Sequence, residues 1–159
     1  MQMNDIQKEY MRKAIELSKV SVANGGGPFG AVIVKDGKII AESSNSVTID
    51  NDPTAHAEVN VIRKACKALN SFELIGCDIY SSCEPCPMCL GAIYWSRLEN
   101  LYFANTKDDA ADIGFDDSFI YEEINVPVEK RRVKTIQFMR EEAIVAFQNW
   151  EEKMDKTEY

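Results

Sequence analysis

The sequence predicts an α/β fold, a three-layer αβα sandwich whose mixed central sheet has about five strands with helices on both faces. Three observations support this prediction. Apolar residues recur at helical spacing near both ends of the 159-residue chain. An Asp-Gly pair at 36–37 separates two strand-like runs, which is a strong signal for a β-hairpin. Between residues 53 and 104, helical and strand patterns alternate, as they do in β-α-β units with parallel strand pairs.

The first third of the chain is predicted to be a helix followed by the hairpin. Residues 5–23 form the helix, and its apolar face consists of Ile6, Tyr10, Ala14, Leu17 and Val20. The glycines at 25–27 end it and favour a tight turn that passes close to a ligand. A phosphate-binding loop is excluded because no strand precedes these glycines. Residues 29–35 and 38–42 are the hairpin strands, and residues 43–51 are expected to be a loop.

The middle of the chain contains the alternating elements. A helix is predicted over residues 53–69, with Asp52 as its N-cap and Pro53 at its first position. The next elements are a strand at 78–82, a helix at 87–96 and a strand at 100–104. Functional sites in such sheets form at the ends of strands.

The last third gives weaker signals. Residues 107–117 are expected to be a loop, followed by a short helix at 118–123. Residues 135–139 are predicted to form a last strand, and residues 141–154 an amphipathic helix. Since no linker or repeat interrupts the pattern, residues 1–159 are interpreted as a single domain.

Two short segments, residues 52–58 and 83–89, carry most of the chemistry. His56, Cys86 and Cys89 form the three-ligand N/S set of a catalytic zinc site, which keeps one position open. Side chains two apart on a helix point to different faces, so His56 and Glu58 can converge only if the metal lies off the helix N-terminus. Glu58 would then be free to move protons rather than bind the metal.

Other interpretations of these residues remain open. Cys86 and Cys89 alone could be a redox pair or half of a structural zinc site. With Cys83 and His56 they would make a closed Cys3His site, which would leave Glu58 without a task. Taken together, the residues favour an open catalytic zinc site over a structural one.

Composition limits the classes of partner. The net charge is −8, which disfavours binding to a nucleic-acid backbone, and the basic cluster at 130–134 is interpreted as a solvated surface. No apolar run is long enough to span a bilayer, and the N-terminal residues do not resemble a signal peptide. An odd number of cysteines, five, does not suggest a disulfide framework. We therefore expect a cytoplasmic protein that binds neither membrane nor nucleic acid.

The compound pattern His-x-Glu and Pro-Cys-x-x-Cys is the signature of zinc-dependent nucleobase deaminases. The chain resembles the cytidine/deoxycytidylate deaminase superfamily and, within it, the short bacterial guanine deaminases. The resemblance rests on residues 26–37, 51–59, 82–95 and 114–121 and on the Glu-Tyr ending at 158–159. It implies hydrolytic deamination of guanine to xanthine and ammonia in purine catabolism or salvage, with one Zn²⁺ per subunit.

The resemblance also implies roles for individual residues. His56, Cys86 and Cys89 would bind the metal, with Glu58 as the proton shuttle and Asp117 as a second catalytic group. Substrate contacts would come from Asn45, Phe29, Trp95, Ala57 and Tyr159. The family forms a dimer in which the C-terminal segment, about residues 141–159, crosses to the neighbour, so that Tyr159 closes the partner's site. The alternatives are a deaminase of cytosine or of adenosine in tRNA, or a structural zinc module without enzymatic activity.

Overall fold

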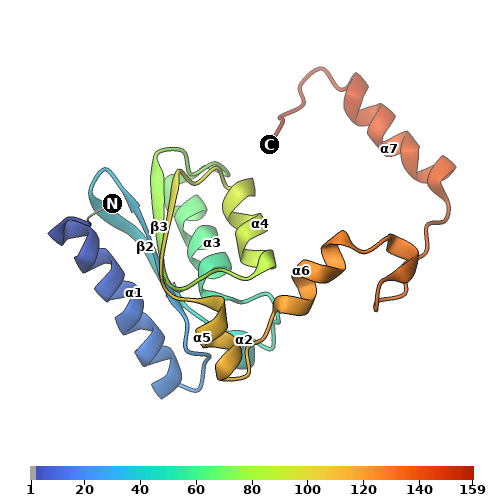
Figure 1. Cartoon of the computed structure of the whole chain (residues 1–159). Coiled ribbons are helices and arrows are strands. Elements are labelled where there is room, and N and C mark those ends of the chain that lie inside the picture. Colours follow the sequence, from blue (N-terminus) through green and yellow to red (C-terminus); the bar gives the residue numbers. More distant parts are fainter. Residues whose placement is uncertain (1–2) are drawn as a thin grey trace. The chain divides into compact units, whose positions relative to one another are not determined.

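The computed structural model describes residues 3–159, which divide into a unit that ends at Asp117 and a unit comprising Ser118–Tyr159. The first unit contains a four-stranded sheet in the order β2-β1-β3-β4 (Figure 1). Its strands are β1 (Gly30–Lys35), β2 (Lys38–Ser44), β3 (Cys77–Cys83) and β4 (Asn100–Asn105). Strand β1 pairs antiparallel with β2 and β3, whereas β3 and β4 are parallel. The sheet is therefore mixed, as predicted, with one strand fewer than expected.

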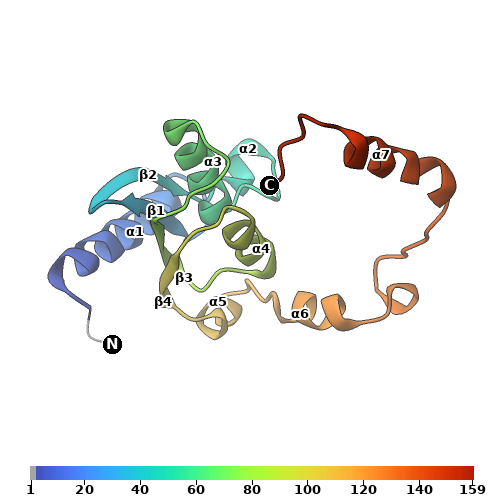
Figure 2. The same cartoon turned by 90° about the horizontal axis from the view of Figure 1, so that it is seen from above.

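Helices cover both faces of this sheet (Figure 2). Helix α1 (Asp5–Ala23) lies on one face, where Val32, Val34 and Tyr80 pack against Ala14. Helices α3 (Ala57–Leu69) and α4 (Pro87–Trp95) lie on the other face. The core on that side includes Ala31, Ile33, Ile79, Val61, Ile62 and Ile93. Alternating strand residues thus enter two separate cores, which confirms the three-layer αβα prediction.

The hairpin forms where the sequence predicts it. Asp36 and Gly37 have φ values of 49° and 72°, the pair of positive angles that a type I′ turn requires. Helix α1 crosses the sheet very close to Gly30, because a Cβ atom there would lie 2.4 Å from the carbonyl oxygen of Ala14. The N-cap of α1 is Asn4, whose side chain accepts a hydrogen bond from the Gln7 N–H at 2.8 Å.

Three predicted elements of the first unit differ from the structure. The helix expected from residue 53 begins at Ala57, because Asp52 Oδ1 accepts hydrogen bonds from Thr54 N–H and Oγ1–H and so closes a turn. The loop expected at 43–51 contains the end of β2 and a short helix, α2 (Val47–Asp50). The loop expected at 107–117 begins with α5 (Lys107–Asp112), whose capping box joins Thr106 and Asp109.

The C-terminal unit consists of helices without a sheet. It contains α6 (Ser118–Asn125), a 3₁₀ turn (Val128–Lys130) and α7 (Arg140–Glu152). The strand predicted at residues 135–139 is wrong: this segment has no regular structure, since no strand edge pairs with it. None of residues 118–159 is buried. Throughout residues 3–159, no helix combines the length and the apolarity needed to cross a bilayer.

Candidate active site

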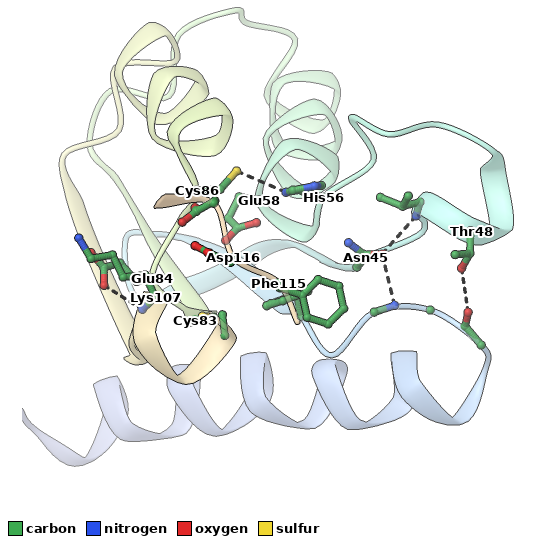
Figure 3. Close-up of a pocket in the computed structure, with 17 residues that line it drawn as sticks. Asn45, Thr48, His56, Glu58, Cys83, Glu84, Cys86, Lys107, Phe115 and Asp116 are labelled. Atoms are coloured by element: carbon green, nitrogen blue, oxygen red, sulfur yellow. Dashed lines mark hydrogen bonds between the residues drawn. The ribbon is translucent and has the colours of Figure 1, made fainter. Parts of the chain in front are cut away.

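Three potential metal ligands meet where two helices begin. His56 and Cys86 are the N-cap residues of α3 and α4, and both have extended backbone conformations. His56 Nδ1 lies 3.5 Å from the Sγ atom of Cys86 (Figure 3). The same nitrogen lies 3.4 Å from the Sγ atom of Cys89. Pro87 occupies the first turn of α4, where its missing N–H costs no hydrogen bond. The turn of α4 then brings Cys89 back beside Cys86.

The spacing of this donor set fits zinc. All three ligand atoms lie within 4.8 Å of one another. Bond lengths of about 2.3 Å to sulfur and about 2.05 Å to nitrogen place two ligands of a tetrahedral zinc roughly 3.6 Å apart. The observed nitrogen–sulfur distances of 3.4 and 3.5 Å are close to that value. One imidazole and two sulfurs are also a ligand set that zinc prefers, and they leave its fourth position open.

Cys83 does not complete a fourth corner. Its thiol points to the carbonyl oxygen of Thr106, with a distance of 3.5 Å from Sγ to O. Among residues 3–159, the side chains that gather as potential metal ligands are His56, Cys86 and Cys89, without Cys83. Burial raises the pKa of the Cys83 thiol to about 11, so the thiol keeps its proton. The geometry therefore does not support a closed Cys3His site.

Glu58 reaches the same point from the first turn of α3. Its carboxylate is only 4% exposed, and burial raises its pKa. Oε1 accepts a hydrogen bond of 2.8 Å from the Ser81 hydroxyl, and Oε2 lies 3.4 Å from Cys89 Sγ. Because His56 precedes the helix whereas Glu58 is inside it, the two side chains converge off the helix N-terminus, as the spacing predicts.

The thiols of Cys86 and Cys89 have pKa values shifted in opposite directions. A hydrogen bond from the Cys89 thiol, assisted by a hydrogen bond to His56, lowers the pKa of Cys86 to about 4. The same interaction with Cys86 raises the pKa of Cys89. The hydrogen bond to Cys86 also raises the pKa of His56. Cys86 is therefore a ready thiolate, the form of cysteine that binds metal.

A cavity of about 500 Å³ opens beside these residues. Its lining includes His56, Glu58, Cys86, Phe29, Asn45, Phe115, Asp116 and Asp117 (Figure 3). A cavity of this size accommodates a small heterocycle.

Asn45 is held in one orientation at the cavity wall. Its Oδ1 accepts hydrogen bonds from the N–H groups of Gly27 and Val47, at 3.3 and 3.2 Å. An amide whose oxygen is engaged in this way turns its NH₂ group in the other direction, so it offers donors. The glycine turn makes this contact possible: a Cβ atom on Gly26 would lie 2.6 Å from the carbonyl oxygen of Asn45.

The aromatic residues divide into two groups. Phe29 lines the cavity and makes an edge-to-face contact with Phe115, with ring centroids 5.0 Å apart. Trp95 is the last residue of α4, is 65% exposed and does not line the cavity. Within this unit the structure thus brings Phe29, but not Trp95, to the cavity. The role of Trp95 stays a prediction.

The remaining predicted residues have different positions. Asp116 and Asp117 both line the cavity, but Asp117 is half-buried and Asp116 is exposed. Burial, together with the charge of Cys86, raises the pKa of Asp117. Ala57 is the first residue of α3, so its N–H has no partner within the helix. Tyr159 belongs to the C-terminal unit and is 72% exposed.

Several residues around the site were not predicted from the sequence. Phe115 precedes the paired aspartates, but its contact with Phe29 needs the fold. The Glu84 carboxylate accepts a hydrogen bond from the Lys107 backbone N–H at 3.1 Å. This bond connects residues 83–89 to α5. A capping-box pattern at Thr106 and Asp109 could have indicated α5. No sequence signal identified Ser81.

Comparison with known proteins agrees with this geometry. Residues 4–105 match the cytidine and deoxycytidylate deaminase zinc-binding region. The chain is 54% identical over 151 residues to guanine deaminase of Bacillus subtilis, covering 94% of this chain and 97% of that protein. The X-ray structure of a guanine deaminase from B. subtilis superposes with a TM-score of 0.94 at 53% identity, over 99% of each chain.

A second group of relatives matches a shorter part of the chain. The tRNA-specific adenosine deaminase of Aquifex aeolicus is 46% identical over 98 residues, which cover 61% of this chain and 65% of that protein. The family model spans residues 4–105, the segment that carries His56, Glu58, Cys86 and Cys89. The matched segment and the nearly full-length similarity lead to one conclusion: this chain belongs to the cytidine and deoxycytidylate deaminase family.

Proposed function

We propose that this protein is a zinc-dependent guanine deaminase, which hydrolyses guanine to xanthine and ammonia. The observation that carries the proposal is the buried Glu58 carboxylate beside an open His56-Cys86-Cys89 set, at the edge of a cavity of about 500 Å³. Similarity to B. subtilis guanine deaminase extends over 94% of the chain, so it includes most of the C-terminal unit. The similarity to the A. aeolicus tRNA-specific adenosine deaminase extends over only 61% of the chain, so the longer match favours guanine.

One Zn²⁺ per subunit would be held by His56, Cys86 and Cys89. Bound zinc would keep both sulfurs as thiolates and lower the pKa of a water molecule toward neutrality. Glu58 would accept the proton that this water loses when its oxygen attacks C2 of guanine. The same carboxyl group would then protonate N3, accept a second proton from the hydroxyl group newly formed at C2, and pass that proton to the departing amine. Burial suits Glu58 to this task, since a raised pKa allows a carboxyl group to carry a proton near neutral pH.

The cavity wall would orient the base. The Asn45 NH₂ group would donate to an acceptor of guanine, such as its carbonyl oxygen, because Asn45 Oδ1 is already bound to two backbone N–H groups. Phe29 would contact one face of the ring, whereas Trp95, which does not line this cavity, stays a prediction for the other face. Asp117, half-buried in the cavity, would hold the amino edge of the base or assist proton transfer. The Ala57 N–H at the start of α3 would stabilise developing negative charge.

The protein would act as a homodimer that exchanges its C-terminal segment, about residues 141–159. Each subunit would still be a single deaminase domain. Two observations support the exchange. First, the unit Ser118–Tyr159 contains no buried residue. Second, it exposes large apolar side chains, since Phe147 and Trp150 of α7 are 74% and 42% exposed. Such a unit needs an apolar partner surface to be stable. Tyr159, at the end of this segment, would close the partner's cavity.

Helix α4 offers a surface for the dimer. It is apolar on nearly all sides, yet Tyr94 and Trp95 are 73% and 65% exposed. A helix without a polar face is normally buried, so a second copy of the chain is a natural cover for it.

Five free cysteines favour a reducing compartment such as the cytoplasm.

A second candidate, deamination of adenosine in tRNA, rests on the similarity of 98 residues to the A. aeolicus enzyme. The net charge of −8 argues against it, because phosphate contacts supply most of the affinity for nucleic acid. Cytosine is a third possible substrate. Zinc analysis combined with ammonia release from guanine, cytosine, adenine and tRNA decides among these. We expect release from guanine. Release from cytosine or tRNA without release from guanine would overturn the proposal.

A further inference from the structure

The hydroxyl group of Ser81 occupies an unusual position for a polar group. Strand β3 directs Cys77 and Ile79 into the core beneath α3, and Ser81 continues the same alternation. The pattern of this face calls for another apolar residue. Instead, a fully buried hydroxyl donates a 2.8 Å hydrogen bond to Glu58 Oε1.

This bond assigns different surroundings to the two oxygens of Glu58. Oε1 faces the sheet and is held by Ser81, whereas Oε2 faces Cys89, at 3.4 Å from Sγ. A carboxylate without the Ser81 bond could rotate about its terminal torsion, which is intrinsically broad. The strand thus fixes the plane of the carboxylate and directs one oxygen to the metal-ligand set.

We propose that Ser81 is a positioning residue, which holds Glu58 in the orientation that proton transfer needs. This inference rests on the proposed deaminase function and assigns a second member to its proton-transfer apparatus. Ser81 lines no part of the cavity and cannot touch the substrate from β3, so it acts through Glu58. Loss of an outer hydrogen-bond partner of this kind typically lowers the activity of a metal site about 10- to 100-fold.

The neighbouring residue supplies a matched control. Ser82 is also buried in β3, but its side chain points to the opposite face, where Oγ accepts a hydrogen bond from the Gly30 N–H at 3.0 Å. Ser82→Ala and Ser81→Ala therefore remove the same hydroxyl group from adjacent buried positions. Only the second change affects Glu58.

The test measures guanine turnover, zinc content and structure for the two variants. We expect Ser81→Ala to retain its zinc and its KM within about twofold, while kcat falls about 10- to 100-fold. Ser82→Ala should retain kcat. A wild-type kcat in Ser81→Ala, or an equal loss of kcat in both variants, would overturn the proposal.

Crystal structures of metal-free wild type and Ser81→Ala give a readout that is independent of activity. We expect the Glu58 carboxylate to rotate in the variant, and an unchanged carboxylate would contradict a positioning role. This readout also separates the two proposals. Wild-type protein without guanine turnover refutes the proposed substrate, whereas the rotation of Glu58 tests Ser81 alone.

Discussion

Glu58 Oε2 lies 3.4 Å from Cys89 Sγ, although the two residues come from the first turns of different helices. This contact places a buried carboxylate beside the sulfur of a candidate metal ligand, while Glu58 itself is not a member of the ligand group. The relationship separates two tasks, metal binding and proton transfer, which substitutions can test one at a time.

Glu58→Gln should retain zinc but lose guanine turnover by several orders of magnitude. The amide preserves the shape of the side chain and can still accept a hydrogen bond from Ser81, but it cannot carry the proton. Metal analysis and ammonia release check this expectation. Glu99→Gln, an exposed change of the same kind, is the control. Turnover near the wild-type rate in Glu58→Gln would remove Glu58 from the mechanism.

Cys83→Ser should bind zinc normally, whereas Cys86→Ser and Cys89→Ser should lose most of their zinc. The reason is geometric: the Cys83 thiol donates a hydrogen bond to the Thr106 carbonyl oxygen and does not belong to the group of potential metal ligands. Metal content after dialysis against a weak chelator is the measurement. If Cys83→Ser loses zinc as readily as the other two variants, the site is closed and structural.

The sequence predicted the first unit and its group of potential metal ligands well, because the signals for both are local. Periodicity located α1, the hairpin and the elements β3, α4 and β4. The His-x-Glu and Cys-x-x-Cys spacings identified residues that the fold brings together. The start of α3 was misjudged because Asp52, a good N-cap residue, instead closes a turn with Thr54. Two possible local structures compete for such a residue, and propensity alone does not separate them.

Features that depend on distant parts of the chain could not be predicted. The strand expected at residues 135–139 is apolar enough to form, but a strand also needs an edge to pair with. The orientation of Asn45 depends on Gly27, and the role of Ser81 depends on Glu58. In both pairs the residues are far apart in sequence, so no spacing rule connects them.

Asn45→Asp should lower kcat/KM for guanine about 10- to 100-fold. The change removes the NH₂ donors, so the acceptor atom of the bound guanine would be buried without a hydrogen-bond partner. The melting temperature of this variant should fall, because Asn45 is buried and a carboxylate is costly to bury, even though its oxygen can still accept from Gly27 and Val47. Asn4→Asp adds the same charge at the N-cap of α1 and is the control. Steady-state kinetics and melting temperatures give the answer. Unchanged kinetics in Asn45→Asp would exclude this contact.

Tyr80 should make the protein sensitive to alkali. It is stacked on Tyr102 with ring centroids 4.6 Å apart, and burial raises its pKa to about 12. In the unfolded chain the pKa of tyrosine is about 10, so the stabilisation is complete below pH 10 and is lost as the pH rises toward 12. Melting temperatures of Tyr80→Phe should therefore fall less steeply over this range than those of wild type. An equally steep fall would show that other groups cause the alkaline loss.

Exchange of the C-terminal segment can be tested by mixing two damaged chains. Glu58→Gln lacks the proton shuttle, and Tyr159→Ala lacks the residue expected to close the partner's cavity. If Tyr159 acts across the dimer, a heterodimer contains one complete site, with Glu58 from one chain and Tyr159 from the other. Random co-assembly should then recover about a quarter of the wild-type activity, because half of the dimers carry one complete site of two. Residues that act within one chain cannot complement each other, so activity no higher than the average of the two separate variants would exclude the exchange.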